Sequence, residues 1–291
     1  MGVGHRLANV VLILALNEHL PTKNKWAPRD CSPSSAGSKT FAEEMSPTMI
    51  MCHTHNFIFI KTHKTAGSSV EVALEGICGP QDVVTPMKTD DGGETESRNH
   101  HGPSRMSTLY AKNKFVRKLI SRTSHLVAPY YWEHMPAHRV RELIGASEFD
   151  RLFSFCFERN PWEKVVSYYQ WKTIGQGRKL DSFRNWIRQK PHRLPKDGKL
   201  WSDGGQQIVS CVLDHRNVEE KLQEVLQEIG APSVRSLPRE KTKSGRSRGD
   251  YRDWYDQDTR DAVTKHFSFE IETMGYRFED PAPDRPIVRR S

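Results

Sequence analysis

The chain has 291 residues and a formal net charge of +8, from 44 lysines and arginines against 36 acidic residues. This moderate surplus favours an anionic partner, but it does not separate nucleic acid, acidic polysaccharide, membrane surface and phosphorylated cofactor. No fixed-period repeat is present, which argues against solenoids and propellers. The candidate targeting segment, Leu7–Leu16, is too short for a transmembrane helix of about 20 residues. A weak signal-peptide core is the alternative interpretation, although no small-residue cleavage site follows promptly.

Composition divides the chain into three parts. Residues 1–48 are interpreted as a poorly ordered leader, because from residue 17 they are rich in Lys, Pro, Ser and Thr and have few large apolar side chains. Residues 49–280 form the predicted globular domain, and residues 281–291 a mobile, basic, proline-rich tail. The five cysteines are widely spread, without a C-x-x-C pair or other metal-ligand spacing. We therefore expect no metal and a reducing, cytoplasmic location.

Two strand-loop-helix units carry the clearest local patterns. Asn56–Ile60 is an apolar run of strand length, followed by a glycine-containing loop and a helix with an apolar face over residues 70–77. Phe153–Phe157 is a second such strand. After it, Asn160 is placed to cap a helix that begins at Pro161.

The remaining elements continue the alternation of strands and helices. A strand is predicted at Gln207–Leu213 and a helix at Val218–Ile229, with a last helix from about Asp258 and an extended segment at Tyr276–Phe278. This alternation predicts an α/β protein with a P-loop-like three-layer fold, in which helices flank a mostly parallel central sheet. Ligands in such folds bind at the carboxyl ends of the strands.

The loop after the first strand contains the parts of a phosphate site. It reads Lys61-Thr62-His63-Lys64-Thr65-Ala66-Gly67-Ser68-Ser69, with a lysine, a glycine that lets the backbone come close and two hydroxyls at a helix start. An ordinary polar turn is the alternative interpretation. A nucleotide triphosphate P-loop would place lysine directly after the second glycine, and here Lys64 precedes Gly67, which argues against an ATP-dependent kinase.

The run FIFIKTHKTAGSS, residues 57–69, resembles the 5'-phosphosulfate loop of the sulfotransferases that use 3'-phosphoadenosine 5'-phosphosulfate (PAPS), in particular the carbohydrate-type branch. The run RNPWE at 159–163, with Ser167 eight residues after Arg159, is similar to the family's 3'-phosphate motif. Residues 251–278 resemble this branch's closing helix. Both donor motifs stand in the family's order, so the resemblance covers most of residues 50–278.

The resemblance implies PAPS as the sulfuryl donor and no metal. The 5' side of PAPS would be bound by Lys64, Thr65, Ala66, Gly67, Ser68 and Ser69. Arg159 can hold the 3'-phosphate through its fork of N–H donors, and Ser167 can complete that site. A late basic loop folds over the 3'-phosphate in the family, which points to Arg246 and Arg248 here.

In-line transfer of the sulfuryl group to a hydroxyl or amine needs a cation and a base. Lys64 occupies the family's position for the cation beside the leaving oxygen. His134 is the first choice for the base, since related enzymes carry a histidine between the two donor motifs; a structural histidine that caps the helix over 137–144 is the alternative. His100 and His101 are the next candidates, followed by Glu133. His63 is interpreted as a loop histidine.

The acceptor is expected to be a carbohydrate or small metabolite, bound by an aromatic insertion with Tyr110, Tyr130, Tyr131 and Trp132. Nucleic acid and stable membrane insertion are not expected. Two other classes stay open on sequence alone. One is a nucleotide-dependent kinase, and the other a non-catalytic module that binds polyanions through basic patches.

Overall fold

The computed structural model describes residues 49–85, 97–100, 131, 134–189, 191–234, 236–237 and 249–290. All of them belong to one compact unit, residues 44–291. The leader predicted for residues 1–48 thus lies outside the described residues except for its boundary at Met49.

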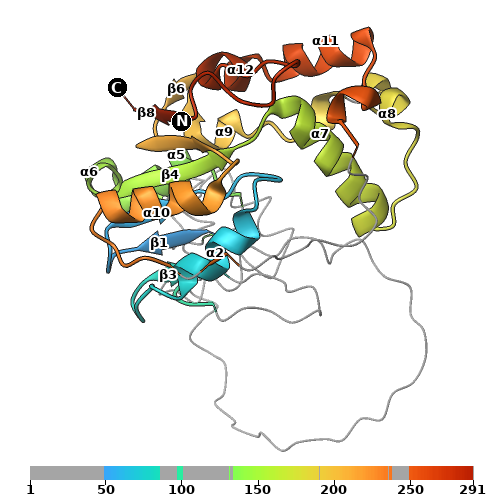
Figure 1. Ribbon diagram of the computed structural model, residues 1–291. Coiled ribbons are helices and arrows are strands. Elements are labelled where there is room, and N and C mark those ends of the chain that lie inside the picture. The colour runs from blue at the N-terminus through green and yellow to red at the C-terminus, as the bar shows by residue number, and fades with distance from the viewer. Residues whose placement is uncertain are drawn as a thin grey trace, which may run out of the picture. The chain divides into compact units, whose positions relative to one another are not determined.

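A six-stranded mixed sheet forms the centre of this unit (Figure 1). Its order is β3-β1-β2-β4-β7-β8, and its three inner strands β2, β4 and β7 run parallel. The other pairings, β3 with β1, β1 with β2 and β7 with β8, are antiparallel. The strands are β1 (Ile50–Cys52), β2 (Phe57–Phe59), β3 (Val83–Val84), β4 (Phe153–Glu158), β7 (Cys211–Asp214) and β8 (Ile287–Arg289), and a separate pair consists of β5 (Ser202–Asp203) and β6 (Gln206–Gln207).

The predicted α/β class is confirmed, whereas the prediction of a mostly parallel sheet holds only for the three inner strands. Two short apolar segments that were not predicted, β1 and β3, add antiparallel strands on one side of the parallel core. The third antiparallel pairing comes from residues 287–289, which lie in the predicted mobile tail but form β8 against β7. Pro281, Pro283 and Pro286 precede these residues and do not interrupt them.

Helices connect the strands, and most lie near their predicted positions. The helix predicted to begin at Pro161 does so, the helix predicted at Val218–Ile229 ends one residue earlier, and the predicted last helix is two helices separated at Phe267. The helical elements are α2 (Gly67–Glu75), α5 (Ala137–Ile144), α6 (Ala146–Arg151), α7 (Pro161–Gln170), the π-helical turn η2 (Trp171–Gly175), α8 (Phe183–Gln189), η3 (Pro191–Arg193), α9 (Gly198–Trp201), α10 (Val218–Glu228), η4 (Tyr251–Trp254), α11 (Gln257–His266) and α12 (Ser268–Met274).

Two further predicted strands are corrected. The strand predicted at 207–213 begins at Cys211, because residues 206–207 pair with β5 instead of joining the central sheet. Tyr276–Phe278 is not a strand; the Tyr276 hydroxyl donates to Asp214 Oδ2 at 2.9 Å, so this segment packs through its side chains.

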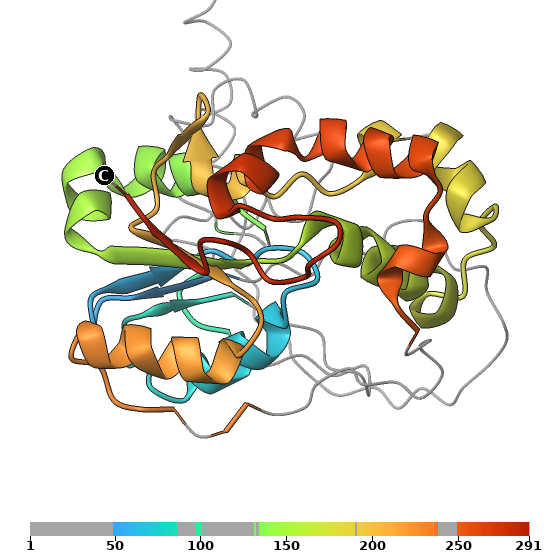
Figure 2. The ribbon, with the colours of Figure 1, turned by 45° about the horizontal axis from the view of Figure 1, so that its top comes forward.

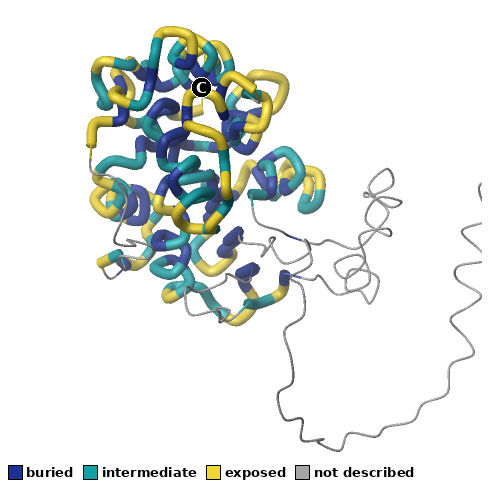
Figure 3. The backbone as a smooth tube through the Cα atoms, turned by 90° about the vertical axis from the view of Figure 1, so that its right-hand side faces the viewer, coloured by how far each residue is buried: buried dark blue, intermediate teal, exposed yellow. Residues whose placement is uncertain are grey.

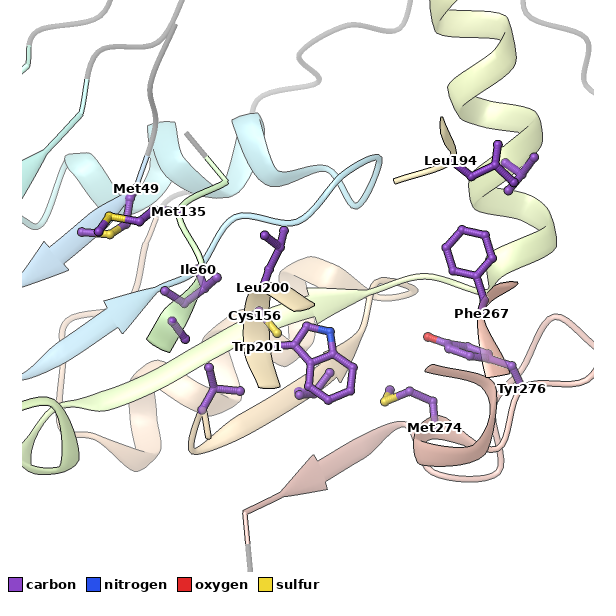
Figure 4. Packing of buried hydrophobic residues seen from close by; sticks show 14 of the residues in the cluster. Met49, Ile60, Met135, Cys156, Leu194, Leu200, Trp201, Phe267, Met274 and Tyr276 are labelled. Atoms are coloured by element: carbon purple, nitrogen blue, oxygen red, sulfur yellow. The ribbon is translucent and has the colours of Figure 1, made fainter. Parts of the chain in front are cut away.

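Alternating side chains on the strands divide the apolar interior into two clusters, one on each face of the sheet. Phe57, Phe59, Phe155 and Phe157 pack with α2 and α10. Ile58, Cys156 and Val212 point the other way, towards the helices α5, α7, α9, α11 and α12. Figure 2 shows α2 and α10 on one side of the sheet and α11 and α12 on the other, and Figure 4 shows Trp201 and Phe267 within the larger cluster.

The inner strands are buried except for Phe153 at the start of β4, and Figure 3 shows buried segments running through the interior of this unit. Burial on both faces explains why β4 reads as a continuous apolar run, since a parallel strand covered by helices has no solvent face. Among the described residues, no helix has the length and apolar character needed to cross a bilayer.

Candidate active site

The two motifs that the sequence pairs lie side by side. β2 and β4 are parallel neighbours, with Phe57 opposite Phe153 and Phe59 opposite Phe155, so the loops that leave their carboxyl ends start at the same edge. The first loop contains Lys64, and the second begins at Arg159. Arg159 Nη1 donates a hydrogen bond of 3.2 Å to the Lys64 carbonyl oxygen, which joins the loops directly.

Backbone geometry gives the first loop a tight turn before α2. Lys64 and Ala66 both have φ of 61°, in the left-handed region. Thr65 is fully buried, and its hydroxyl lies 2.9 Å from that of Thr62, which in turn donates to the carbonyl of Phe157. The side chain of Thr65 therefore stabilises the turn, and any contact of this residue with a ligand would use its backbone N–H.

Gly67 starts α2 under the side chain of Lys61. A Cβ on Gly67 would lie 2.8 Å from Lys61 Cγ, closer than side-chain atoms normally approach. Lys61 cannot easily move, because its Nζ lies 2.8 Å from Glu71 Oε2 and both side chains are at most 7% exposed. The backbone of Gly67 thus lies close to the side chain of Lys61 and its buried ion pair, and this contact alone favours glycine here. Ser69 is buried beside it, while Ser68 is partly exposed at the helix start.

Lys64 faces an aromatic surface. Its Nζ lies 5.3 Å from the centroid of the Trp171 ring, and Lys172 Nζ lies 4.7 Å from the ring of Tyr168. Tyr168 and Trp171 are 5.6 Å apart, at the point where α7 changes into the π-helical turn η2. Such turns are frequent at functional sites. These partly exposed rings were not identified from the sequence.

Arg159 and Ser167 line one cavity of about 430 Å³, as the resemblance implies for a common phosphate site. Helix α7 brings them together, since Ser167 follows Arg159 by about two turns. Asn160 caps this helix as predicted, accepting from Trp162 N at 3.1 Å. The opposite wall includes residues 249–252. Arg246 and Arg248, predicted to contact the donor, lie outside the described residues.

The described wall of this cavity is balanced in charge. Arg159 Nε lies 3.5 Å from Glu163 Oε2, one helical turn further along α7. Asp250 accepts bonds of 2.9 and 2.8 Å from Arg252 Nε. Two carboxylates thus accompany two guanidinium groups. A dianionic phosphate here would have to compete with Glu163 for Arg159.

Beneath the two loops lies a buried ionic cluster of Glu158, Lys164 and Asp197, called here the buried triad. Lys164 Nζ donates to Asp197 Oδ2 at 2.8 Å and also to Glu158, and all three side chains are at most 1% exposed. The second oxygen of Glu158 accepts from Trp201 Nε1 at 3.1 Å. Glu158 also accepts from the backbone N–H of Arg159 at 2.8 Å, so the triad holds the start of the second loop.

Burial and pairing act in opposite directions on the three charges. Burial raises the pKa of Glu158 to about 7, against the opposing effect of Lys164. Burial would also raise the pKa of Asp197, but Lys164 and His63 hold it well below its usual range. The two carboxylates outweigh burial at Lys164 and raise its pKa. Lys164 and Asp197 are therefore charged at neutral pH, and Glu158 is the group nearest to titration.

Two histidines stack above the triad. The ring centroids of His63 and His134 are 3.6 Å apart and the rings are inclined by 18°. His63 Nδ1 lies 2.5 Å from Asp197 Oδ1, and its backbone N–H donates to the other oxygen of that carboxylate at 2.9 Å. His134, at φ of 52°, bonds through Nδ1 to the Lys61 carbonyl at 2.9 Å. It does not cap α5, whose cap position is Pro136.

The other predicted site residues have different positions. His100 is buried, and its carbonyl accepts from Tyr131 N. Tyr131 belongs to the apolar cluster, where burial raises the pKa of its hydroxyl. The remaining candidates lie outside the described residues: His101, Tyr110, Tyr130, Trp132 and Glu133.

Sequence reasoning missed Lys61, Glu158, Lys164 and Asp197. Glu158 and Lys164 did leave a signal, since a carboxylate that ends an apolar strand and a lysine on the buried side of a helix need partners. Asp197 left none, because it stands in an unremarkable polar loop, Lys196-Asp197-Gly198.

Away from this site, the potential ligand atoms of Cys52, Cys78 and Asp82 lie within 4.8 Å of one another. Asp82 already accepts bonds from the Cys52 thiol and from the backbone N–H groups of His53, Thr54 and Gly79. A hydrogen bond with Cys78 and burial raise the pKa of Cys52 well above its usual range. Metal ligation would need the thiolates and a rearrangement of the bonds that Asp82 makes, and in its described arrangement the cluster connects two loops.

Comparison with family models gives no match to this chain, and no solved structure matches it. A protein of Archaeoglobus fulgidus, named only as uncharacterized, is 34% identical to the chain over 102 residues. The match covers 34% of this chain and 84% of the archaeal protein. The chain therefore belongs to the same family as this archaeal protein. That name assigns no activity, so function has to be argued from the site.

Proposed function

We propose that this protein is a sulfotransferase that moves the sulfuryl group of PAPS to a hydroxyl or amine of an acceptor. The observation that carries the proposal is the contact between the two donor motifs, made by the 3.2 Å bond from Arg159 to the Lys64 carbonyl. The motifs are 95 residues apart in the chain. Only the parallel pairing of β2 and β4 brings them to one edge.

A donor phosphorylated at both the 3' and 5' positions needs two separate anion sites that face the same nucleotide. The turn before α2 supplies backbone N–H groups at a helix start, with Lys64 at its apex. Arg159 and Ser167 supply a second site in the adjoining cavity. Helices on both faces of the sheet are compatible with the P-loop-like three-layer arrangement that this reading requires.

In the proposed reaction, the acceptor oxygen attacks sulfur while the bond between sulfur and the bridging oxygen of the 5'-phosphate breaks. Negative charge grows on that bridging oxygen, and Lys64 is the cation placed to stabilise it. The π contact of Lys64 with Trp171 positions the ammonium group without neutralising it.

The acceptor class proposed is a carbohydrate or small metabolite. The rings of Tyr168 and Trp171 next to Lys64 offer a surface on which a sugar ring can stack. A cytoplasmic location is part of the proposal, since the four cysteines within the described residues are free thiols.

The first test is binding of 3'-phosphoadenosine 5'-phosphate (PAP), the product of the donor. At one hundred times its Kd, PAP stabilises the fold by about 2.7 kcal/mol, which corresponds to a rise in Tm of about 5 to 10 °C for a domain of this size. The second test is transfer from labelled PAPS to a panel of acceptors, read by mass spectrometry as an added sulfuryl group. Lys64→Ala should abolish transfer.

Lys265→Ala is the matched control, because Lys265 is an exposed lysine on α11 outside both loops. It should retain both PAP binding and transfer. If PAP leaves Tm unchanged while ATP with Mg²⁺ raises it, the chain is a kinase and the proposal fails. Salt-sensitive binding of heparin that Lys64→Ala and Lys265→Ala weaken equally, without PAP binding, would instead identify a polyanion-binding module.

A further inference from the structure

We propose that His63 is the general base of the transfer, and that Asp197 is the positioning residue that orients it and stabilises its protonated form. The inference rests on the proposed function and names a residue of that same site. It replaces the sequence-based interpretation of His63 as a loop histidine and moves the base away from His134.

The partners of the two rings fix their tautomers. A carboxylate and a carbonyl oxygen only accept hydrogen bonds, so Nδ1 is the protonated nitrogen both in His63, which bonds to Asp197, and in His134, which bonds to the Lys61 carbonyl. In each neutral ring the basic lone pair is therefore on Nε2. The His63 side chain is 30% exposed and Asp197 only 1%, so the accessible part of the ring lies away from Asp197.

The two stacked rings differ in the group that accepts from Nδ1. His63 Nδ1 donates to a buried carboxylate and His134 Nδ1 to a backbone carbonyl. Two imidazolium cations with centroids 3.6 Å apart would repel each other strongly in a partly buried site, so one ring serves as the proton acceptor. The carboxylate beside His63 provides the counter-charge for a proton taken up at its Nε2.

The buried triad gives this proton a counter-charge. Lys164 neutralises one of the two carboxylates, and the other has no second cation among the triad's members. When His63 accepts a proton, it becomes a second cation beside Asp197, whose other oxygen accepts from Lys164. An Asp–His pair in an enzyme is commonly used in this way, with the aspartate remaining ionised.

The position of His63 in the loop places it beside the leaving group. His63 is the residue before Lys64. The ring of Tyr168 lies between their surroundings: its centroid is 6.5 Å from that of His63, edge-on, and 5.6 Å from that of Trp171, the ring that Lys64 faces. An acceptor stacked on these rings would stand between His63 and the sulfur held by Lys64. In the step, the acceptor O–H proton passes to His63 Nε2 and the new O–S bond forms. The electron pair of the broken S–O bond leaves with the 5'-phosphate of PAP.

A first test needs no acceptor. Diethyl pyrocarbonate modifies the neutral imidazole nitrogen, and peptide mapping at pH 8 gives a rate for each histidine. We expect His63 to react faster than the exposed His192 on η3, and Asp197→Asn to slow His63 at least threefold without changing His192. A faster reaction at His134 than at His63, or an unchanged His63 rate in Asp197→Asn, would overturn the inference. Asp197→Asn should fold, because Lys164 keeps Glu158 as its partner.

The second test is turnover with the best acceptor of the panel. His63→Ala should lower kcat by about 10²- to 10⁴-fold, the usual contribution of a general base, and added imidazole should restore at least tenfold. His134→Ala should retain more than a tenth of the wild-type kcat. If His134→Ala lowers kcat by more than His63→Ala does, the base is His134.

A split between kcat and KM separates positioning from a purely structural role. The groups that face His63 are Asp197, the rings of His134 and Tyr168 and, through Asp197, Lys164, with Lys64 next in the chain. Asp197→Asn should lower kcat at least tenfold while KM for PAPS stays within twofold of the wild type, because the imidazole is present but no longer held by the carboxylate. Equal changes in kcat and KM would contradict the role given to Asp197.

PAP binding distinguishes the two levels of the proposal. All three variants should bind PAP within twofold of the wild type, since none removes a donor contact. If PAP binds and His63→Ala keeps full kcat, the base assignment fails and the sulfotransferase proposal stands. If PAP does not bind the wild type, the proposed function fails, and the modification rates still report whether Asp197 activates His63.

Discussion

Lys164 is the position where one substitution tests the buried triad most directly. Lys164→Met keeps most of the aliphatic stem and removes the only ammonium group in the triad, whose Nζ also lies 5.9 Å from the centroid of the Phe267 ring. Glu158 and Asp197 then face each other in a dry interior with no cation between them. Both carboxylates become harder to ionise, so their pKa values rise.

The expected loss is large because Lys164 is fully buried and serves two carboxylates. Removing one partner of a buried pair costs about 3 to 5 kcal/mol, a large share of the roughly 5 to 15 kcal/mol that stabilises a domain. The loss should grow with pH. Acids whose pKa is raised by folding contribute stability below their unfolded pKa and lose it as pH rises through the folded pKa. The variant is therefore closest to wild type near pH 5.

Urea unfolding at pH 5 and pH 8 measures both effects. With a urea slope of about 3 kcal/mol per molar, a loss of 4 kcal/mol lowers the midpoint by about 1.3 M at pH 8. Arg139→Met is the control, because its ion pair with Glu142 is about half exposed and such pairs contribute about 0 to 1 kcal/mol. If Lys164→Met costs no more than this control at pH 8, the triad is not what holds these loops together.

Three further outcomes follow from the same contacts. Glu158→Gln should flatten the fall in unfolding free energy between pH 4.5 and about 7, where burial raises the pKa of the wild-type carboxyl; urea unfolding across that range checks the slope. Glu163→Gln should tighten PAP binding by about two- to fivefold, since it frees Arg159 from an ion pair worth up to about 1 kcal/mol, as calorimetry would show. Gly67→Ala should lower stability by about 1 to 3 kcal/mol through overpacking against Lys61 and weaken PAP binding, both measurable by thermal shift.

The sequence predicts the parallel centre of this fold because those strands are buried on both faces. β2 is wholly apolar and β4 mostly so, and the helix after β4 has clear start signals in Asn160 and Pro161. The outer strands give no such pattern. β8 is only three residues long, ends in Arg289 and pairs with β7 through its backbone, so its side chains carry little information about its pairing.

The same limit applies to the site. Lys64, Arg159 and Ser167 could be proposed from sequence because they stand at fixed spacings within strand-to-helix junctions, where local sequence determines geometry. Asp197 could not be found in this way. It comes from a short loop 134 residues after His63, and only the packing of α9 brings it beneath that residue. A contact of this kind depends on the whole fold and leaves no local pattern.

This difference also explains why the histidine ranking from sequence favoured His134. His134 was chosen because it lies between the two donor motifs, where related enzymes carry a histidine. His100 and His101 also lie between these motifs. What distinguishes a base is its partner, and the partner of His63 is a buried carboxylate that an internal lysine keeps ionised. Because that lysine also binds Glu158 under Arg159, the group that would hold the donor's 3'-phosphate and the group that would accept the proton share one electrostatic support. A change at Lys164 should therefore reduce donor binding and proton transfer together, whereas a change at His63 should affect proton transfer alone.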